Sequence, residues 1–182
     1  MKRNCDLTKL SAFSKKKQCW HAVVETPKGS HNKYDYEPEL GCFRMSKSLP
    51  EGMTFPFDFG FIPSTLGEDG DPLDVLILMD FGALPGALVE IRLVGGIKAE
   101  QKDKGEDWVR NDRLIAVFRR ARNFEKIGSM SDLRADFLDE VAQFFEQYNK
   151  LDHKQFRALG EYSAKEAAEL VEHGMHAFKK KG

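Results

Sequence analysis

The sequence predicts an α+β domain in which a closed β-barrel forms the core and helices pack outside it. Short apolar segments bounded by glycine or proline recur between residues 20 and 118, which is typical of strands joined by turns. A helical period of apolar residues is found only after residue 130. Many short strands favour a barrel, and strands followed by helices favour the α+β class.

The strands are expected to begin with residues 20–26, which end at the turn Pro27-Lys28-Gly29. Residues 88–94 partly alternate between apolar and polar side chains, as a half-buried strand should. Residues 99–112 are almost wholly polar and predict a loop or an exposed hairpin. The expected strands cover residues 20–26, 31–36, 42–45, 60–62, 75–79, 88–97 and 114–118.

Two helices are expected in the C-terminal part. Ser131 is predicted to cap the first, and Ser163-Ala164-Lys165-Glu166 forms a capping box at the start of the second. The apolar side of the first helix consists of Leu133, Phe137, Val141, Phe144, Phe145 and Tyr148. The second is expected to bury Ala167, Leu170, Val171 and Phe178.

The composition indicates one domain in 182 residues, with a polar N-terminal extension at 1–18, loosely attached, and a single domain at 19–182. A net charge of −1 gives no general attraction to nucleic acid or to an anionic membrane, so neither partner is expected. No apolar segment resembles a signal peptide or reaches membrane-spanning length. Three cysteines without paired spacing indicate reduced thiols in a cytoplasmic protein.

The most informative segment is Asp69-Gly70-Asp71-Pro72-Leu73-Asp74, which runs into an apolar strand at 75–79. Like charges about 4 Å apart repel by about 1 kcal/mol in water and about 4 kcal/mol at a protein surface. Three carboxylates held together therefore indicate a bound cation, and hard oxygen ligands suit Mg²⁺. The alternative is a turn with solvated aspartates. A calcium loop is excluded because Leu73 and Asp74 occupy its fifth and sixth positions.

This segment resembles the signature of the family I soluble inorganic pyrophosphatases, and the resemblance covers roughly residues 20 to 160. It implies a five-stranded, OB-like closed barrel flanked by helices. It also implies hydrolysis of inorganic diphosphate to two orthophosphates by a metal-activated water. The expected cofactor is Mg²⁺ at several ions per site, with Mn²⁺ or another divalent ion as the alternative, and the expected assembly is a homo-oligomer in the cytoplasm.

The resemblance also implies roles for the acidic residues. Asp69 and Asp74 match the metal ligands of the motif, and Asp71 matches the general base and is also counted among the metal-site residues. Glu25 lies at the end of its strand, where the family carries an acidic site residue.

The polar segment 99–112 leaves two alignments open. Because buried strands tolerate insertions less than loops, we prefer to anchor on the strand that Arg113 enters, which makes Asn111 a metal-site residue. An anchor on Gly105-Glu106-Asp107 would select Asp107 instead. Glu100 is the expected first acid, with Gln101, Asp103 and Asp112 as alternatives.

Basic residues are expected to hold the phosphate groups. Lys33, in Lys33-Tyr34-Asp35, matches a phosphate-binding lysine, and Asp35 replaces a longer acid. Lys47 stands where many family members have arginine, and it keeps the charge without the bidentate fork. Lys98 and Arg113 are further phosphate-binding candidates.

Two aromatic residues complete the expected substrate pocket. Tyr148 matches a site tyrosine, whereas Phe59 stands at the position of another and brings no hydroxyl, so packing is its expected role. The lysine that usually follows Tyr148 is Asn149 here. Lys150 is no simple replacement, because neighbouring residues on a helix point about 100° apart.

These departures leave two alternative functions. A relative on the same fold could cleave another phosphoanhydride, such as a nucleotide or polyphosphate, because Lys47, Phe59 and Asn149 alter the phosphate pocket. A non-catalytic relative could bind metal or phosphate, or use the barrel to bind a partner. The three retained aspartates and the absence of a net basic charge argue against this second alternative.

Overall fold

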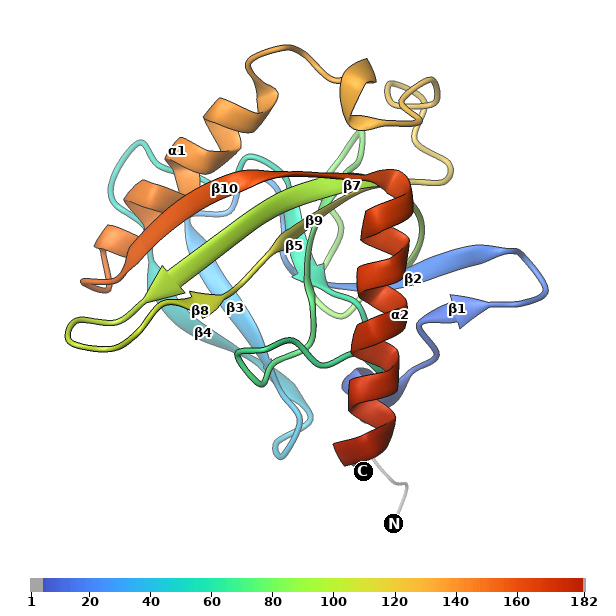
Figure 1. Ribbon diagram of the computed structural model, residues 1–182, viewed down its shortest axis with the longest axis horizontal. Coiled ribbons are helices and arrows are strands. Elements are labelled where there is room, and N and C mark those ends of the chain that lie inside the picture. The colour runs from blue at the N-terminus through green and yellow to red at the C-terminus, as the bar shows by residue number, and fades with distance from the viewer. Residues whose placement is uncertain (1–4, 182) are drawn as a thin grey trace.

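The computed structural model describes residues 5–181, and a closed ring of five strands forms its centre (Figure 1). In order around the ring these are β2 (Cys19–Thr26), β5 (Asp58–Phe61), β6 (Asp74–Leu78), β9 (Arg113–Phe118) and β7 (Leu88–Lys102). Pairing of β7 with β2 closes the ring. The strands β6 and β9 run parallel, and the other neighbours run antiparallel. The predicted closed five-stranded barrel is confirmed.

The central strands are buried on both faces, which explains why their sequences are continuous apolar runs. Leu76 and Leu78 of β6 pack in one cluster with Phe145 of α1 (Phe137–Lys150). Val75 and Ile77 point to the opposite face and pack in a second cluster with Val171 of α2 (Ala164–Lys181). The period-2 alternation of a strand thus divides the core between the two helices.

The shorter strands extend or flank the ring. β3 (Asn32–Glu37) and β4 (Cys42–Ser48) form a separate antiparallel pair. β1 (Phe13–Ser14) pairs with β2, and β8 (Val109–Arg110) pairs with β7. β10 (Gln155–Ser163) lies antiparallel along β7, as Figure 1 shows.

The strand β7 is longer than the expected 88–97, and β10 was not expected. The polar end of β7 continues to Lys102 because it has partners on both sides, β8 and β10. Phe156 is the one buried residue of β10, so this strand has no alternating pattern. The polar segment 99–112 forms an exposed hairpin, which is one of the two forms predicted for it.

The helices agree with the prediction at α2 and differ at α1. Ser163 N donates to Glu166 Oε2 at 2.8 Å, and Glu166 N donates to Ser163 Oγ at 3.3 Å, which confirms the capping box. The prediction that Ser131 caps α1 is wrong, because Ser131 lies in the short 3₁₀ helix η2 (Met130–Asp132) and α1 begins at Phe137.

The buried sets of the helices differ only in detail from those expected. Ala167 and Val171 of α2 are buried, whereas Leu170 and Phe178 are half-buried. In α1, Phe144 and Tyr148 are half-buried and pack against the core cluster that contains Phe145.

The described part of the N-terminal extension, residues 5–18, is packed against the barrel. Leu7, in the 3₁₀ helix η1 (Leu7–Lys9), and Leu10 pack against a cluster formed by Val23, Tyr36 and Phe61. Ala12 is buried, and its carbonyl accepts a hydrogen bond from His21 N at 2.8 Å. The expectation that this segment is loosely attached is therefore wrong for these residues.

Within residues 5–181, the cysteines Cys5, Cys19 and Cys42 are free, as expected. No helix in this part of the chain is both long enough and apolar enough to cross a membrane.

Candidate active site

A cleft of about 830 Å³ collects most of the residues that the sequence singles out. Its walls come from the ends of the barrel strands, the β3–β4 pair, the β7–β8 hairpin and the C-terminal end of α1. The predicted site residues that line it are Glu25, Lys33, Phe59, Asp69, Asp71, Asp74, Asn111, Arg113 and Tyr148.

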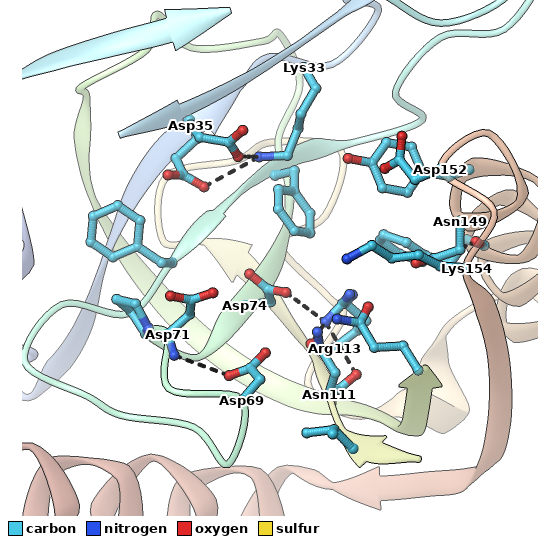
Figure 2. Close-up of a pocket in the computed structure, with 18 of the residues that line it drawn as sticks. Lys33, Asp35, Asp69, Asp71, Asp74, Asn111, Arg113, Asn149, Asp152 and Lys154 are labelled. Carbon is cyan, nitrogen blue, oxygen red and sulfur yellow. Dashed lines mark hydrogen bonds and ion pairs between the residues drawn. The ribbon is translucent and has the colours of Figure 1, made fainter. Parts of the chain in front are cut away.

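The loop that enters β6 holds three of the carboxylates. Asp71 N donates to Asp69 Oδ1 at 3.2 Å, and Gly67 N donates to Asp71 O at 2.7 Å. A Cβ at Gly67 would lie 2.9 Å from Asp69 Oδ1, so a side chain there would displace this carboxylate. Gly70 turns the loop with a left-handed φ of 93°. Figure 2 shows Asp69, Asp71 and Asp74 facing the same part of the cleft.

Arg113 is the main cation on this side of the cleft. It opens β9, which runs parallel to β6, and its Nη1 lies 2.6 Å from Asp74 Oδ2. The same nitrogen donates to the side chain of Asn111, and the guanidinium lies 4.9 Å above the ring of Phe145. Burial raises the pKa of Asp74, and the charge of Arg113 opposes this shift. Arg113 thus neutralises the innermost aspartate of the loop.

Lys33 is the main cation on the opposite wall. Its Nζ lies 2.5 Å from Asp35 Oδ1 and 3.6 Å from Glu25 Oε2, and its side chain is buried. Burial raises the pKa of Glu25 to about 7, against the opposing charge of Lys33. Phe59 is buried, and its ring lies 4.8 Å from Lys33 Nζ, so it supports the ammonium by packing and by its π face.

Tyr148 projects from α1 into the cleft, where it meets Lys47 at the rim. Lys47 Nζ lies 3.7 Å from the centre of the tyrosine ring, and Lys47 also forms an ion pair with Asp152. Burial raises the pKa of the Tyr148 hydroxyl, and the nearby charge of Asp35 adds to the effect. The phenol therefore keeps its proton and can act as a hydrogen-bond donor near neutral pH.

The lining of the cleft is strongly acidic, with eleven carboxylates against five Lys or Arg side chains. Hard oxygen ligands and an excess of negative charge are what a divalent cation such as Mg²⁺ or Mn²⁺ requires. Within residues 5–181, no three His, Cys, Asp or Glu side chains already converge on one metal position. Asp74 is turned towards Arg113, and Asp69 accepts a hydrogen bond from its own loop. The oxygen donors of the cleft fit a divalent cation when Asp74 exchanges Arg113, and Asp69 its loop amide, for the metal.

Comparison with known proteins identifies the fold. The family model described as inorganic pyrophosphatase matches residues 22–179, which is most of the chain. The chain belongs to the inorganic pyrophosphatase family. This agrees with the resemblance carried by the 69–74 segment.

Individual pyrophosphatases match over nearly their full lengths. The inorganic pyrophosphatase of Thermus thermophilus is 38% identical over 150 residues, which cover 82% of this chain and 83% of that protein. That of Halalkalibacterium halodurans is 36% identical, over 83% of this chain and 90% of its own. A Thermus thermophilus crystal structure superposes with a TM-score of 0.87 at 35% identity, over 96% of this chain and 99% of that one. A Coxiella burnetii structure gives 0.82 at 32% identity, over 93% and 99%.

Three residues expected in the pyrophosphatase site are not part of the cleft lining. One is Lys47, which contacts the lining residues Tyr148 and Asp152. Lys98 and Glu100 of β7 are absent from the cleft lining, and each has its partner on a neighbouring element. Lys98 Nζ lies 3.4 Å from Glu166 Oε1 on α2. Glu100 Oε2 accepts two hydrogen bonds from Arg157, at 2.8 and 3.0 Å. The structure thus brings neither Lys98 nor Glu100 into the cleft, where the sequence predicted them.

The structure also shows where the alternative acidic or amide residues of the segment 99–112 lie. Gln101, Asp103 and Asp107 line the pyrophosphatase cleft. Asp112 does not, because it accepts hydrogen bonds from Ala99 N at 2.9 Å and from the Tyr162 hydroxyl at 2.7 Å.

The cleft also contains residues that the sequence did not reveal. Asp152 and Lys154 follow α1 and line the wall beside Tyr148. No local pattern marks them, because their position depends on the turn after the helix. Lys102 and Arg44 are further cations of the lining that were not expected.

Proposed function

We propose that this chain hydrolyses inorganic diphosphate to two orthophosphates in the presence of a divalent metal, with water as the nucleophile. Membership of the pyrophosphatase family supports the substrate. The observation that carries the proposal is the placement of Asp69, Asp71 and Asp74 in one cleft with the buried cations Lys33 and Arg113.

Lys33 and Arg113 bind the phosphate oxygens. Both side chains are buried, so their charges cannot turn to water and are directed into the cleft. The charge-assisted hydrogen bonds that Lys33 or Arg113 can make to a phosphate group are comparable with those that the same side chain makes to a carboxylate. Lys47 adds positive charge at the rim, and the Tyr148 hydroxyl donates a hydrogen bond to a phosphate oxygen.

Asp69 and Asp74 hold the metal, with Glu25 and Asn111 at the edge of the same site. We assign Mg²⁺ as the cation, with several ions per site and Mn²⁺ as the alternative, because the donors are oxygens. When bound, such ions neutralise phosphate charge and lower the pKa of water.

Asp71 takes the proton of the attacking water. It is exposed in the cleft, and no Lys or Arg forms an ion pair with it anywhere in residues 5–181. An unpaired carboxylate at hydrogen-bond distance of a water is a competent general base. Direct attack by water requires no covalent phosphoenzyme.

The decisive test is phosphate release from diphosphate by purified protein with Mg²⁺. We expect multiple turnovers, and no phosphate release would overturn the proposal. Asp71→Asn should lose most of kcat while its circular dichroism spectrum is unchanged, and wild-type turnover would remove Asp71 from the base role.

The alternative that the chain cleaves another phosphoanhydride is tested with ATP and tripolyphosphate. A higher kcat/KM for either compound than for diphosphate would make that compound the preferred substrate and contradict the proposal.

We also propose a cytoplasmic location and a homo-oligomer. The three free cysteines support a reducing compartment. Phe81 and Leu84 are 85% and 80% exposed on one loop, and such apolar side chains favour contact with another copy. Light scattering on a size-exclusion column measures the assembly, and a monomeric mass at micromolar concentration would contradict it.

A further inference from the structure

The turn after α1 folds the chain back to the cleft. Asp152 N and Lys154 N both donate to Asn149 O at 3.0 Å, and His153 adopts a left-handed φ of 59°. The turn places Lys154 beside the last turn of α1, where it lines the cleft. Figure 2 shows its ammonium group directed into the cleft.

The end of α1 itself brings no cation to this wall. Asn149 is buried, and its Nδ2 donates to Phe145 O at 2.8 Å, so its amide serves the helix. Lys150 is exposed and does not line the cleft. Lys154 is therefore the cation that the segment from α1 to the following turn contributes to the cleft lining.

The ion pair of Lys154 is exposed to solvent, unlike the buried ion pairs of Lys33 and Arg113. Lys33 and Arg113 are paired with carboxylates while buried, with side chains 7% and 5% exposed. Lys154 Nζ lies 3.1 Å from Asp103 Oδ2 on the β7–β8 hairpin, and these side chains are 34% and 44% exposed. Exposed ion pairs contribute little, so a phosphate group with more negative charge replaces such a carboxylate easily.

We propose that Lys154 is a phosphate-binding residue of this cleft and that Asp103 holds its ammonium in place until a phosphate group displaces the carboxylate. The proposal rests on the diphosphate hydrolysis proposed above and adds a contact delivered from the turn after α1. The ligand that it predicts is a phosphate group of the diphosphate substrate or its orthophosphate product.

The test compares Lys154→Met with Lys150→Met, which removes an exposed charge from the same region. Binding of methylenediphosphonate, a diphosphate analogue that water does not cleave, is measured by calorimetry with Mg²⁺ present. Loss of one charge-assisted contact should weaken binding in Lys154→Met by about 10-fold or more. Lys150→Met should bind like the wild type, and Lys154→Arg should keep most of the affinity.

Asp103→Asn tests the second part of the proposal. It frees Lys154 from its carboxylate, so the analogue should bind as tightly as in the wild type or more tightly. Weaker binding would overturn the role given to Asp103.

The outcomes separate this inference from the proposed function. A wild-type protein that releases no phosphate from diphosphate contradicts the function. An active wild type together with unchanged affinity and KM in Lys154→Met overturns the inference alone. Circular dichroism and the urea midpoint verify that each variant is folded, and Lys154→Gln replaces Lys154→Met if the latter is not.

Discussion

Arg113 and Asp74 occupy the first positions of two neighbouring parallel strands, and their side chains meet with 2.6 Å between Nη1 and Oδ2. The fold thus builds the ion pair from strand register, since the residues that follow, Val75 and Leu114, are paired in the sheet. The carboxylate is placed at the mouth of the barrel by the same strand that supplies the core.

Arg113→Met should destabilise the protein by about 3 kcal/mol, because it leaves the carboxylate of Asp74 without its partner. Urea unfolding without metal measures the loss. The double variant Arg113→Met/Asp74→Asn should recover much of it, since both charges are then absent. Equal stability of the single and double variants would show that Asp74 does not need the guanidinium.

Asp58 is fully buried in β5, away from the aspartate loop. Its Oδ1 accepts a hydrogen bond from Ala83 N at 2.8 Å, whereas its Oδ2 has no hydrogen-bond partner within residues 5–181. Burial raises the pKa of Asp58 above its usual value, so the folded protein retains a proton that the unfolded chain has released. The free energy of unfolding should therefore fall as pH rises from about 4, the usual Asp pKa, through the raised folded value.

Asp58→Asn removes this titration. The free energy of unfolding of the variant minus that of the wild type should increase between pH 4 and pH 8. Urea unfolding at several pH values measures the difference, and a pH-independent difference would show that Asp58 ionises in the folded protein as easily as in the unfolded chain.

Ser163→Ala should cost about 1 kcal/mol of stability, because it removes one half of the capping box of α2. Ser131→Ala is the matched control. Ser131 lies in η2, and within the described residues 5–181 its Oγ has one hydrogen-bond partner, Ser129 Oγ at 2.9 Å, so a smaller loss is expected. Thermal unfolding compares the two variants, and an equal or larger loss in Ser131→Ala would contradict the assignment of the caps.

The parts of the fold that could be predicted are those in which local sequence and burial agree. The strand β6 is an apolar run because both of its faces are covered, and the capping box satisfies the amides of Ser163 and Glu166 with residues only three apart in the sequence. The strand β10 could not be predicted, because its exposed residues carry no pattern and its partner is the polar end of β7. The boundary of α1 also depends on tertiary contacts.

The same distinction applies to the cleft. The aspartate loop, Lys33 and Arg113 could be placed in it from motif spacing. Glu100 could not be told from Gln101, because a shift of one residue along a strand moves a side chain to the other face. Lys154 was not predicted to be a site residue. It reaches the cleft because of the left-handed turn at His153, and no sequence pattern predicts that turn.

Metal should stabilise this protein through the aspartate loop. Burial, with the neighbouring carboxylates of Asp74 and Asp71, raises the pKa of Asp69 to about 6, which shows that negative charge is unfavourable there. Asp69→Asn should therefore raise the melting temperature without metal, since it removes a repulsive charge. It should also reduce the further rise in melting temperature on adding Mg²⁺. For the wild type, one ion bound at 100 times its Kd stabilises the folded protein by about 2.7 kcal/mol.

Differential scanning calorimetry in EDTA and in Mg²⁺ measures both effects of Asp69→Asn. Glu51→Gln is the control, because Glu51 is exposed and lies outside the cleft lining. It should match the wild type under both conditions. The two effects must occur together, because the charge that destabilises the metal-free loop is the one that binds the cation. A variant with lower stability in EDTA and an unchanged response to Mg²⁺ would mean that Asp69 serves the loop and not the metal.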